Sequence, residues 1–274
     1  MPYDPTIYLG AAAHYLNGRP PYSAELATTL QRELHLDGRG RLLDVGCGPG
    51  VLTIDLAGLF DEAIGLDPDA DMLTVAARRA EQHQLTNVSW IRALAAEIPR
   101  LELGSLRLVT FGQSFQWTDR ERVAEAVYDL LEPGAAMACI AHEVQGRPTP
   151  PGPDHPTIPH DQIGTLVDCY LGARRRAGQG YSNPQPDRYE DAIARTRFGR
   201  PRTVHAPGRP DIVRDIDSIV DGIYSMSWSA PHLFGDQRAQ FEVELRTLLR
   251  QHSPEGLFWD WPGDTAVVIA TKPT

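Results

Sequence analysis

The 274-residue sequence is poor in cysteine and has no long apolar run. Its three cysteines, Cys47, Cys139 and Cys169, are 92 and 30 residues apart. That spacing excludes a disulfide framework and a CxxC-type zinc site. No run of 18 apolar residues exists, and Met1–Gly10 lacks a basic segment followed by an apolar one. We therefore expect neither a membrane span nor a secretory signal, and a cytoplasmic protein.

Positive charge is also scarce. There are 26 basic residues against 36 acidic ones, a net charge of −10, and Lys272 is the single lysine. A nucleic-acid-binding surface needs a basic excess, so the composition argues against one. The hydrophobic share of 42% and the charged share of 23% are typical of a globular chain. The length suits one large α/β domain, or a core domain with an added subdomain.

Apolar strand-like runs alternate with amphipathic helical runs through the first 143 residues. We predict strands at 41–45, 63–66, 88–91, 106–111 and 135–141, and helices beginning near Ser23, Val51, Asp69 and a Thr118/Glu121 capping box. Strands separated by helices in regular order form parallel β-α-β units. The predicted fold class is therefore α/β with a doubly wound sheet.

This alternation ends at Gln145, where a proline- and glycine-rich stretch follows. Beyond it we predict helices at 161–172 and 188–196, a strand at 202–205, a helix from Asp236, and a terminal hairpin of 256–261 with 265–271. The predicted domains are an α/β core at 1–143, an inserted cap at 144–200, and a return to the core sheet at 201–274.

The most informative segment is the glycine turn that follows the first predicted strand, Leu42 to Gly50. A dinucleotide-binding fingerprint would need glycine at position 51, where this chain has Val51. Asp44 precedes the turn inside the end of the strand. A carboxylate there suits a ligand with a cation nearby better than a ligand with a phosphate.

A second acid, Asp67, ends the second predicted strand 23 residues after Asp44. This is close to the offset of about 20 residues expected of a ribose-binding acid. One carboxylate can accept hydrogen bonds from two adjacent hydroxyls. The alternative is a helix-capping role, for which Asp69 and Asp71 are better placed.

Together, these motifs resemble the class I S-adenosylmethionine-dependent methyltransferases, in particular the type 11 methyltransferase-domain group. The turn Asp44–Gly50 resembles the first motif of that family, acid-x-Gly-x-Gly-x-Gly. Further similarities are 94–99 (with Leu94 in place of an aspartate), 111–117, 130–134, and 15–22 as an N-terminal lid segment. The resemblance implies a Rossmann-like, mostly parallel seven-stranded sheet and S-adenosylmethionine as cofactor, leaving S-adenosylhomocysteine as product.

The resemblance also implies a set of cofactor contacts. In the family the glycine loop approaches the methionyl part of the cofactor, an acid orients its amino group, and a lid arginine matches its carboxylate. The residues expected to bind the cofactor are Tyr15, Arg19, Asp44, Gly46, Cys47, Gly48, Gly50, Asp67, Pro68, Met72, Leu94, Ala95, Gln113 and Ser114. Arg19 could instead be a surface arginine, Met72 a core residue, and Glu97 the source of the missing acidic contact.

Methyl transfer needs an aligned nucleophile, exclusion of water and, for some acceptors, removal of a proton, and it needs no metal. His142 and Glu143, after the fifth strand, are the candidate proton acceptors, with structural hydrogen bonding as the alternative. The predicted acceptor pocket comprises Gln116, Trp117, Tyr224, Trp228 and His232. The last three could equally be core residues. The acceptor is expected to be a small molecule.

Charge is uneven along the chain. Residues 172–210 contain nine arginines and three acids, a local +6. A solvated face is the simple interpretation; the sharper hypothesis is a cap that attracts an anionic acceptor. Two alternative functions remain open at this point: a nicotinamide-dependent oxidoreductase and a cofactor-binding scaffold without catalytic activity.

Overall fold

The structure is a computed structural model that describes residues 4, 6–143, 151–181 and 187–274. These residues form two compact units. The sheet unit lies within Tyr22–Glu143, Pro184–Pro207 and Asp264–Thr274. The helical unit lies within Met1–Pro21, Val144–Asn183 and Gly208–Gly263.

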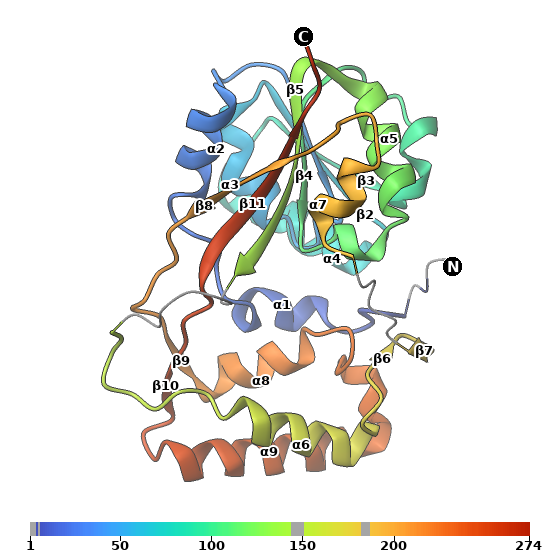
Figure 1. Cartoon of the computed structure of the whole chain (residues 1–274). Coiled ribbons are helices and arrows are strands. Elements are labelled where there is room, and N and C mark those ends of the chain that lie inside the picture. Colours follow the sequence, from blue (N-terminus) through green and yellow to red (C-terminus); the bar gives the residue numbers. More distant parts are fainter. Residues whose placement is uncertain (1–3, 5, 144–150, 182–186) are drawn as a thin grey trace. The chain divides into compact units, whose positions relative to one another are not determined.

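A seven-stranded sheet in the order β3-β2-β1-β4-β5-β11-β8 is the centre of the sheet unit (Figure 1). Its strands are β1 (Arg41–Val45), β2 (Glu62–Asp67), β3 (Val88–Arg92), β4 (Leu106–Gly112), β5 (Leu131–Glu143), β8 (Arg202–Ala206) and β11 (Asp264–Thr271). The four neighbouring pairs among β1–β5 are parallel. β11 runs antiparallel to both β5 and β8. The predicted α/β, doubly wound and mostly parallel sheet is confirmed.

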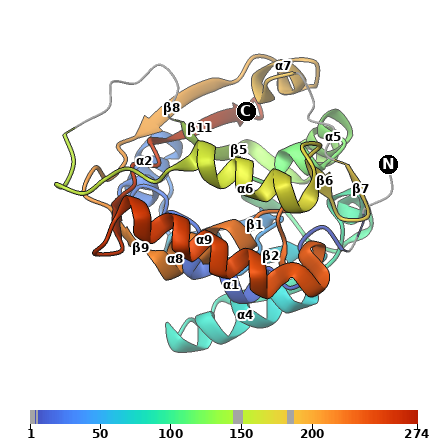
Figure 2. The ribbon, with the colours of Figure 1, turned by 90° about the horizontal axis from the view of Figure 1, so that it is seen from below.

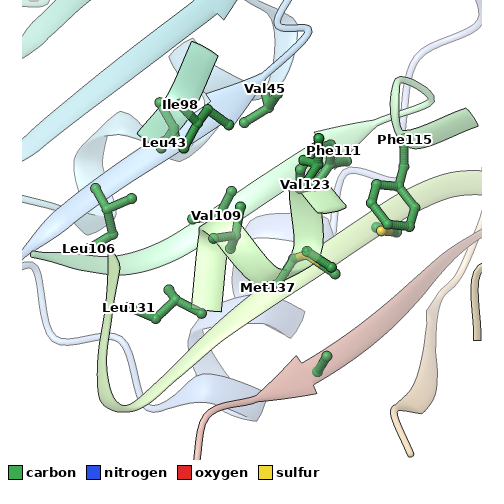
Figure 3. Close-up of a cluster of buried hydrophobic side chains, with 14 of the residues drawn as sticks. Leu43, Val45, Ile98, Leu106, Val109, Phe111, Phe115, Val123, Leu131 and Met137 are labelled. Atoms are coloured by element: carbon green, nitrogen blue, oxygen red, sulfur yellow. The ribbon is translucent and has the colours of Figure 1, made fainter. Parts of the chain in front are cut away.

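Helices cover both faces of this sheet. They are α2 (Leu26–Leu34), α3 (Val51–Leu56), α4 (Ala70–Gln82), α5 (Arg120–Leu130), α7 (Tyr189–Ala194) and the short 3-10 turns η1 (Ala57–Leu59), η2 (Ala95–Arg100) and η3 (Phe115–Trp117). Leu42 packs in a buried cluster with residues of α2 and α3, and its neighbour Leu43 packs in a second cluster with residues of α5. Figure 3 shows the second cluster, which contains Val123 of α5 together with Val109 of β4 and Met137 of β5. Because both faces are buried, the strands are continuous apolar runs.

The helix starts follow local capping rules, with one correction. Asp69 caps α4 as predicted: its side chain accepts hydrogen bonds from the backbone N–H groups of Asp71 and Met72. The predicted Thr118 cap of α5 is wrong by one residue. Asp119 accepts from the N–H of Arg122, whereas the Thr118 hydroxyl donates to the carbonyl of Phe115.

The predicted C-terminal hairpin is wrong. β10 (Leu257–Trp259) pairs with β9 (Val213–Asp215), and β11 inserts between β5 and β8. Side chains of β11 are buried on both faces of the sheet, Val267 in one cluster and Val268 in the other. A strand buried in this way needs a partner on each edge, which a hairpin with β10 alone would not supply.

The helical unit has its own core. Its remaining elements are α1 (Ala12–Gly18), α6 (His160–Leu171), β6 (Arg176–Ala177), β7 (Gly180–Tyr181), α8 (Ile216–Tyr224), the 3-10 turn η4 (Pro231–Gln237) and α9 (Arg238–His252). α9 lies beside α6 and α8 (Figures 1 and 2), and Ile163, Ile219 and Leu245 of these helices share one buried cluster. The helix predicted from Asp236 is α9, which begins at Arg238. No helix within the described ranges is long and apolar enough to cross a membrane.

The two units divide the chain differently from the predicted segments. Residues 1–21 belong to the helical unit rather than to the sheet unit, and residues 208–263 do not return to the sheet. Residues 184–207, predicted as part of the cap and of the return, belong to the sheet unit through α7 and β8. The predicted start of the cap, residues 144–150, lies outside the described residues.

Candidate cofactor and active site

The glycine turn joins β1 to α3, and its three glycines have different surroundings. All three have positive φ: +67° at Gly46, +53° at Gly48 and +74° at Gly50. A Cβ on Gly46 would lie 2.5 Å from the Cβ of Ser114, and a Cβ on Gly50 would lie 2.6 Å from the ring of Trp90. A Cβ on Gly48 would meet nothing within 4 Å. The missing side chains of Gly46 and Gly50 thus let Ser114 and Trp90 pack against the turn. At Gly48 no protein atom covers the turn, so its backbone is open to a ligand.

Hydrogen bonds fix this turn against the end of β2. The N–H groups of Gly46 and Cys47 both donate to the carbonyl of Leu66, at 2.7 and 3.1 Å. From α4, Arg79 donates to the carbonyl of Pro49 at 2.8 Å. The Cys47 side chain is buried, and burial raises the pKa of its thiol well above the ordinary value, so this cysteine is not an activated nucleophile.

Asp44 supports the turn from inside. Its carboxylate accepts hydrogen bonds from the hydroxyls of Thr53 in α3, at 2.7 Å, and Thr110 in β4, at 2.8 Å. Only 1% of the residue is exposed, and this burial raises its pKa to about 6 despite the two hydroxyl donors. In the structure Asp44 links β1 to α3 and β4 through these two hydrogen bonds. Its expected contact with a cofactor amino group stays a prediction.

Asp67 lies beside the open part of the turn. Its carboxylate accepts from the N–H of Gly48 at 2.8 Å and from the N–H of Asp69 at 2.9 Å. Capping of α4 is left to Asp69, as predicted. Burial raises the pKa of Asp67 to about 6. Two backbone donors leave acceptor capacity on a carboxylate, and adjacent ribose hydroxyls would fit it.

The neighbouring strand end contributes an apolar rim. Leu94 precedes η2, and its N–H donates to the Glu97 carboxylate at 2.8 Å. Glu97 therefore caps its own short helix. This hydrogen bond uses one oxygen of the carboxylate that was expected, as an alternative, to supply the acidic cofactor contact missing at Leu94. Ala95 begins η2, and the first N–H groups of a helix have no carbonyl partner within that helix. Met72 of α4 is buried and Pro68 is half-buried.

The segment after β4 packs directly on the glycine turn. The Ser114 hydroxyl donates to the carbonyl of Val45. Gln113 is a non-glycine residue with φ of +52°, and its N–H donates to the carbonyl of Ile140 at 2.9 Å. Gln116 is half-buried, whereas Trp117 is 40% exposed. This segment thus brings four of the predicted residues to the carboxyl edge of the sheet.

The two candidate proton acceptors face opposite sides of β5. The His142 ring stacks on Tyr22, with centroids 5.0 Å apart and planes at 20°. Glu143 forms an ion pair with His205 of β8. Successive strand residues point to opposite faces, so His142 and Glu143 cannot act as one unit on the same proton. The half-buried Glu143 carboxylate is held by its ion pair with His205 on the other face, and His142 is the candidate base that we retain.

Three comparisons bear on this constellation. Residues 42–134, from β1 to the start of β5, match the model of a family described as "Methyltransferase domain". This is a class I S-adenosylmethionine-dependent methyltransferase domain. The matched family is described only as a methyltransferase domain, so membership of the type 11 subgroup stays a prediction. S-adenosylmethionine is the cofactor of the class, and the open backbone at Gly48 beside the Asp67 carboxylate fits it.

Sequence relatives match about half of this chain. CRG1 of Saccharomyces cerevisiae, a probable S-adenosylmethionine-dependent methyltransferase, is 29% identical over 46% of this chain and 44% of its own length. The demethylmenaquinone methyltransferase of Lactiplantibacillus plantarum is 31% identical over 42% of this chain and 51% of its own. The chain thus spans about half the length of these relatives.

Solved structures support the fold. A protein from Anaeromyxobacter dehalogenans, assigned as a type II methyltransferase, superposes with a TM-score of 0.50 at 18% identity, covering 93% of this chain and 99% of that one. A methyltransferase-type protein from Bacillus halodurans also gives 0.50, at 13% identity, covering 92% and 100%.

Five predicted site residues belong to the helical unit, whereas residues 42–134 belong to the sheet unit. Arg19 donates to the carbonyl of Ser225 at 2.9 Å and lies over the ring of Tyr15. Tyr224 is fully buried among aromatic rings of the unit's core, which corrects its assignment to an acceptor pocket. Trp228 lies under Arg175, and His232 contacts the carbonyl of Leu9. The roles of these last two, and of Tyr15 and Arg19, stay predictions.

The positive charge of residues 172–210 is largely neutralised, and its members divide between the two units. The ion pairs are Arg175 with Asp168, Arg188 with Glu190, Arg195 with Glu121 and Asp187, Arg197 with Glu125 and Asp129, Arg202 with Glu33, and Arg209 with Asp211. Half of these eight acids come from α5 and α2, far away in the sequence. The local +6 is therefore not the charge of one basic surface.

Several residues of the site have no place in the sequence-based prediction. Thr53 and Thr110 hold Asp44, and Trp90 closes the turn beside Gly50. Tyr189 contacts Gln116 from α7, and His205 pairs with Glu143. Trp90 lies opposite Gly65 in the register of β2 and β3, which the sequence alone does not fix. The other contacts join segments that no local pattern relates.

Proposed function

We propose that this protein transfers the methyl group of S-adenosylmethionine to an oxygen, nitrogen or carbon atom of a small-molecule acceptor. The observation that carries the proposal is the placement of the buried Asp67 carboxylate against the N–H of Gly48, where the turn's backbone is open. A carboxylate that can accept hydrogen bonds from ribose hydroxyls thus lies beside backbone that a ligand can approach closely. A nucleoside ligand requires both features.

The proposed cofactor roles follow from these positions. Asp67 accepts hydrogen bonds from the ribose hydroxyls, and the turn around Gly48 receives the methionyl part. Leu94, Ala95 and Met72 supply an apolar and backbone edge for the adenine. The bound cofactor supplies the methyl group as a sulfonium substituent, so the chain's own task is to orient the acceptor and exclude water.

The names of the relatives support a small organic acceptor. They include the demethylmenaquinone methyltransferase and a ubiquinone biosynthesis O-methyltransferase of Acinetobacter baylyi, 30% identical over 34% of this chain and 40% of its own length. Where the acceptor atom carries a proton, His142 at the end of β5 is the proposed base. The proposal of an anionic acceptor rests on Arg174 and Arg176 of the Arg174–Arg176 run, because Arg175 and most other arginines of that segment are ion-paired.

Calorimetry with S-adenosylhomocysteine tests the cofactor site. We expect the wild-type chain to bind and Asp67→Ala to bind about 10- to 100-fold more weakly, since hydrogen bonds to a charged group are lost. Asp71→Ala is the matched control: it removes the same charge from an exposed position four residues further along. Equal affinity in Asp67→Ala and Asp71→Ala would contradict the assignment.

Two further measurements separate the alternatives. Binding of NADH in place of S-adenosylhomocysteine would favour an oxidoreductase. Turnover of S-adenosylmethionine over a panel of hydroxylated aromatic acceptors distinguishes an enzyme from a cofactor-binding scaffold, because a scaffold would bind the cofactor without forming S-adenosylhomocysteine.

A further inference from the structure

A chain of side-chain contacts joins α7 to the segment after β4. The Tyr189 hydroxyl donates to the amide oxygen of Gln116, and the Gln116 amide nitrogen donates to the carbonyl of Gln113 at 2.6 Å. Tyr189 is also held by its ring, which packs edge-on against Phe115 at 5.6 Å. From α5, the guanidinium of Arg120 lies 5.0 Å from the centre of the same ring.

The far end of this chain of contacts is a strained residue. Gln113 has a left-handed backbone that non-glycine residues adopt only when their surroundings impose it. Its N–H is fixed by Ile140 and its carbonyl by Gln116. The next residue, Ser114, is the one that lies against Gly46 of the glycine turn. The conformation of Gln113 therefore sets where the segment meets the cofactor turn.

Tyr189 packs against the buried cluster of the sheet unit, and two further features fix its hydroxyl as a donor toward Gln116. Burial raises the pKa of Tyr189 to about 12, so the group stays a neutral hydroxyl donor throughout the working pH range. Arg120 is buried, donates to the carbonyl of Asp187 at 2.7 Å, and so fixes the chain just before α7. The ring and the preceding backbone are both immobilised, which orients the hydroxyl toward Gln116.

We propose that Tyr189 is a positioning residue of the methyl-transfer site, which acts through Gln116 to hold Gln113 and the segment after β4 in place. The proposal rests on the function proposed above for that segment. It also gives residues 187–194 a role in the site, although they follow β5 by more than 40 residues.

The test is Tyr189→Phe, which removes the hydroxyl and keeps the ring between Phe115 and Arg120. Tyr128→Phe is the matched control, because Tyr128 also packs edge-on against a phenylalanine, Phe198, and lies under an arginine, Arg197. Hydrogen exchange is measured without ligand. We expect the amides of 113–117 to exchange about three- to tenfold faster in Tyr189→Phe than in Tyr128→Phe, in line with one lost hydrogen bond.

A binding measurement accompanies it. S-adenosylhomocysteine should bind Tyr189→Phe about three- to tenfold more weakly than wild type, and Tyr189→Phe should add nothing in a Gln116→Ala background. Unchanged exchange at 113–117 overturns the positioning role whether or not the ligand binds. Failure of the wild-type chain to bind the ligand would instead overturn the proposed function and leave the exchange result to decide the role of Tyr189.

Discussion

The contrast between Gly46 and Gly48 gives the sharpest prediction about the cofactor turn. Both have positive φ, so alanine at either position adopts a left-handed backbone at a cost of about 1–2 kcal/mol. Only Gly46 faces protein: its added methyl carbon would lie 2.5 Å from the Cβ and 3.1 Å from the hydroxyl of Ser114. The space at Gly48 is open.

The magnitudes differ accordingly. Ser114 is buried and donates to the carbonyl of Val45, so displacing it leaves that carbonyl without its partner, which costs about 1–3 kcal/mol more. We expect Gly46→Ala to lower the free energy of unfolding by about 2–5 kcal/mol and Gly48→Ala by about 1–2 kcal/mol. At roughly 2–4 °C per kcal/mol, the melting temperature should fall roughly 4–20 °C for Gly46→Ala and roughly 2–8 °C for Gly48→Ala.

Ligand affinity should show the other half of the contrast. The methyl group of Gly48→Ala occupies the surface proposed for the cofactor, so S-adenosylhomocysteine should bind it at least about tenfold more weakly although the protein remains folded. Thermal unfolding and calorimetry on the same preparations measure both effects. Equal loss of stability in the two variants would refute the packing argument, and full affinity in Gly48→Ala would refute the cofactor assignment.

Two other predictions concern titration and proton transfer. Because the pKa of Asp44 in the folded chain is about 6 against an ordinary 3.8, the folded state binds the proton more tightly. Stability should therefore fall as the pH rises from about 4 to 6, by up to about 3 kcal/mol from this group. Asp44→Asn should remove this share of the slope in urea titrations across that range, and an unaltered slope would contradict it. For an acceptor that loses a proton, His142→Ala should lower kcat about 100-fold or more, whereas Glu143→Gln, on the other face of β5, should stay within a few-fold. S-adenosylhomocysteine formation measures both rates, and similar losses in the two variants would exclude His142 as the specific base.

Local sequence patterns predicted the methyltransferase domain well. The strands β1 to β4 and the Asp69 cap lie where periodicity and capping residues indicated, because these features depend on neighbours within a few residues. The glycine turn and Asp67 were also predictable, since strand ends in a parallel sheet meet at one edge. The opposed faces of His142 and Glu143 follow from strand alternation alone, but their partners do not.

Contacts between distant segments decided the remaining features. The run 264–271 looks like one arm of a hairpin, yet its two buried faces bring it between β5 and β8. Counting arginines along 172–210 gave a basic segment, whereas half of the acids that pair with these arginines come from α5 and α2. Tyr189 reaches Gln116 across 73 residues. Periodicity and spacing describe the chain over a few turns, while pairing, neutralisation and side-chain positioning depend on which distant surfaces become buried together.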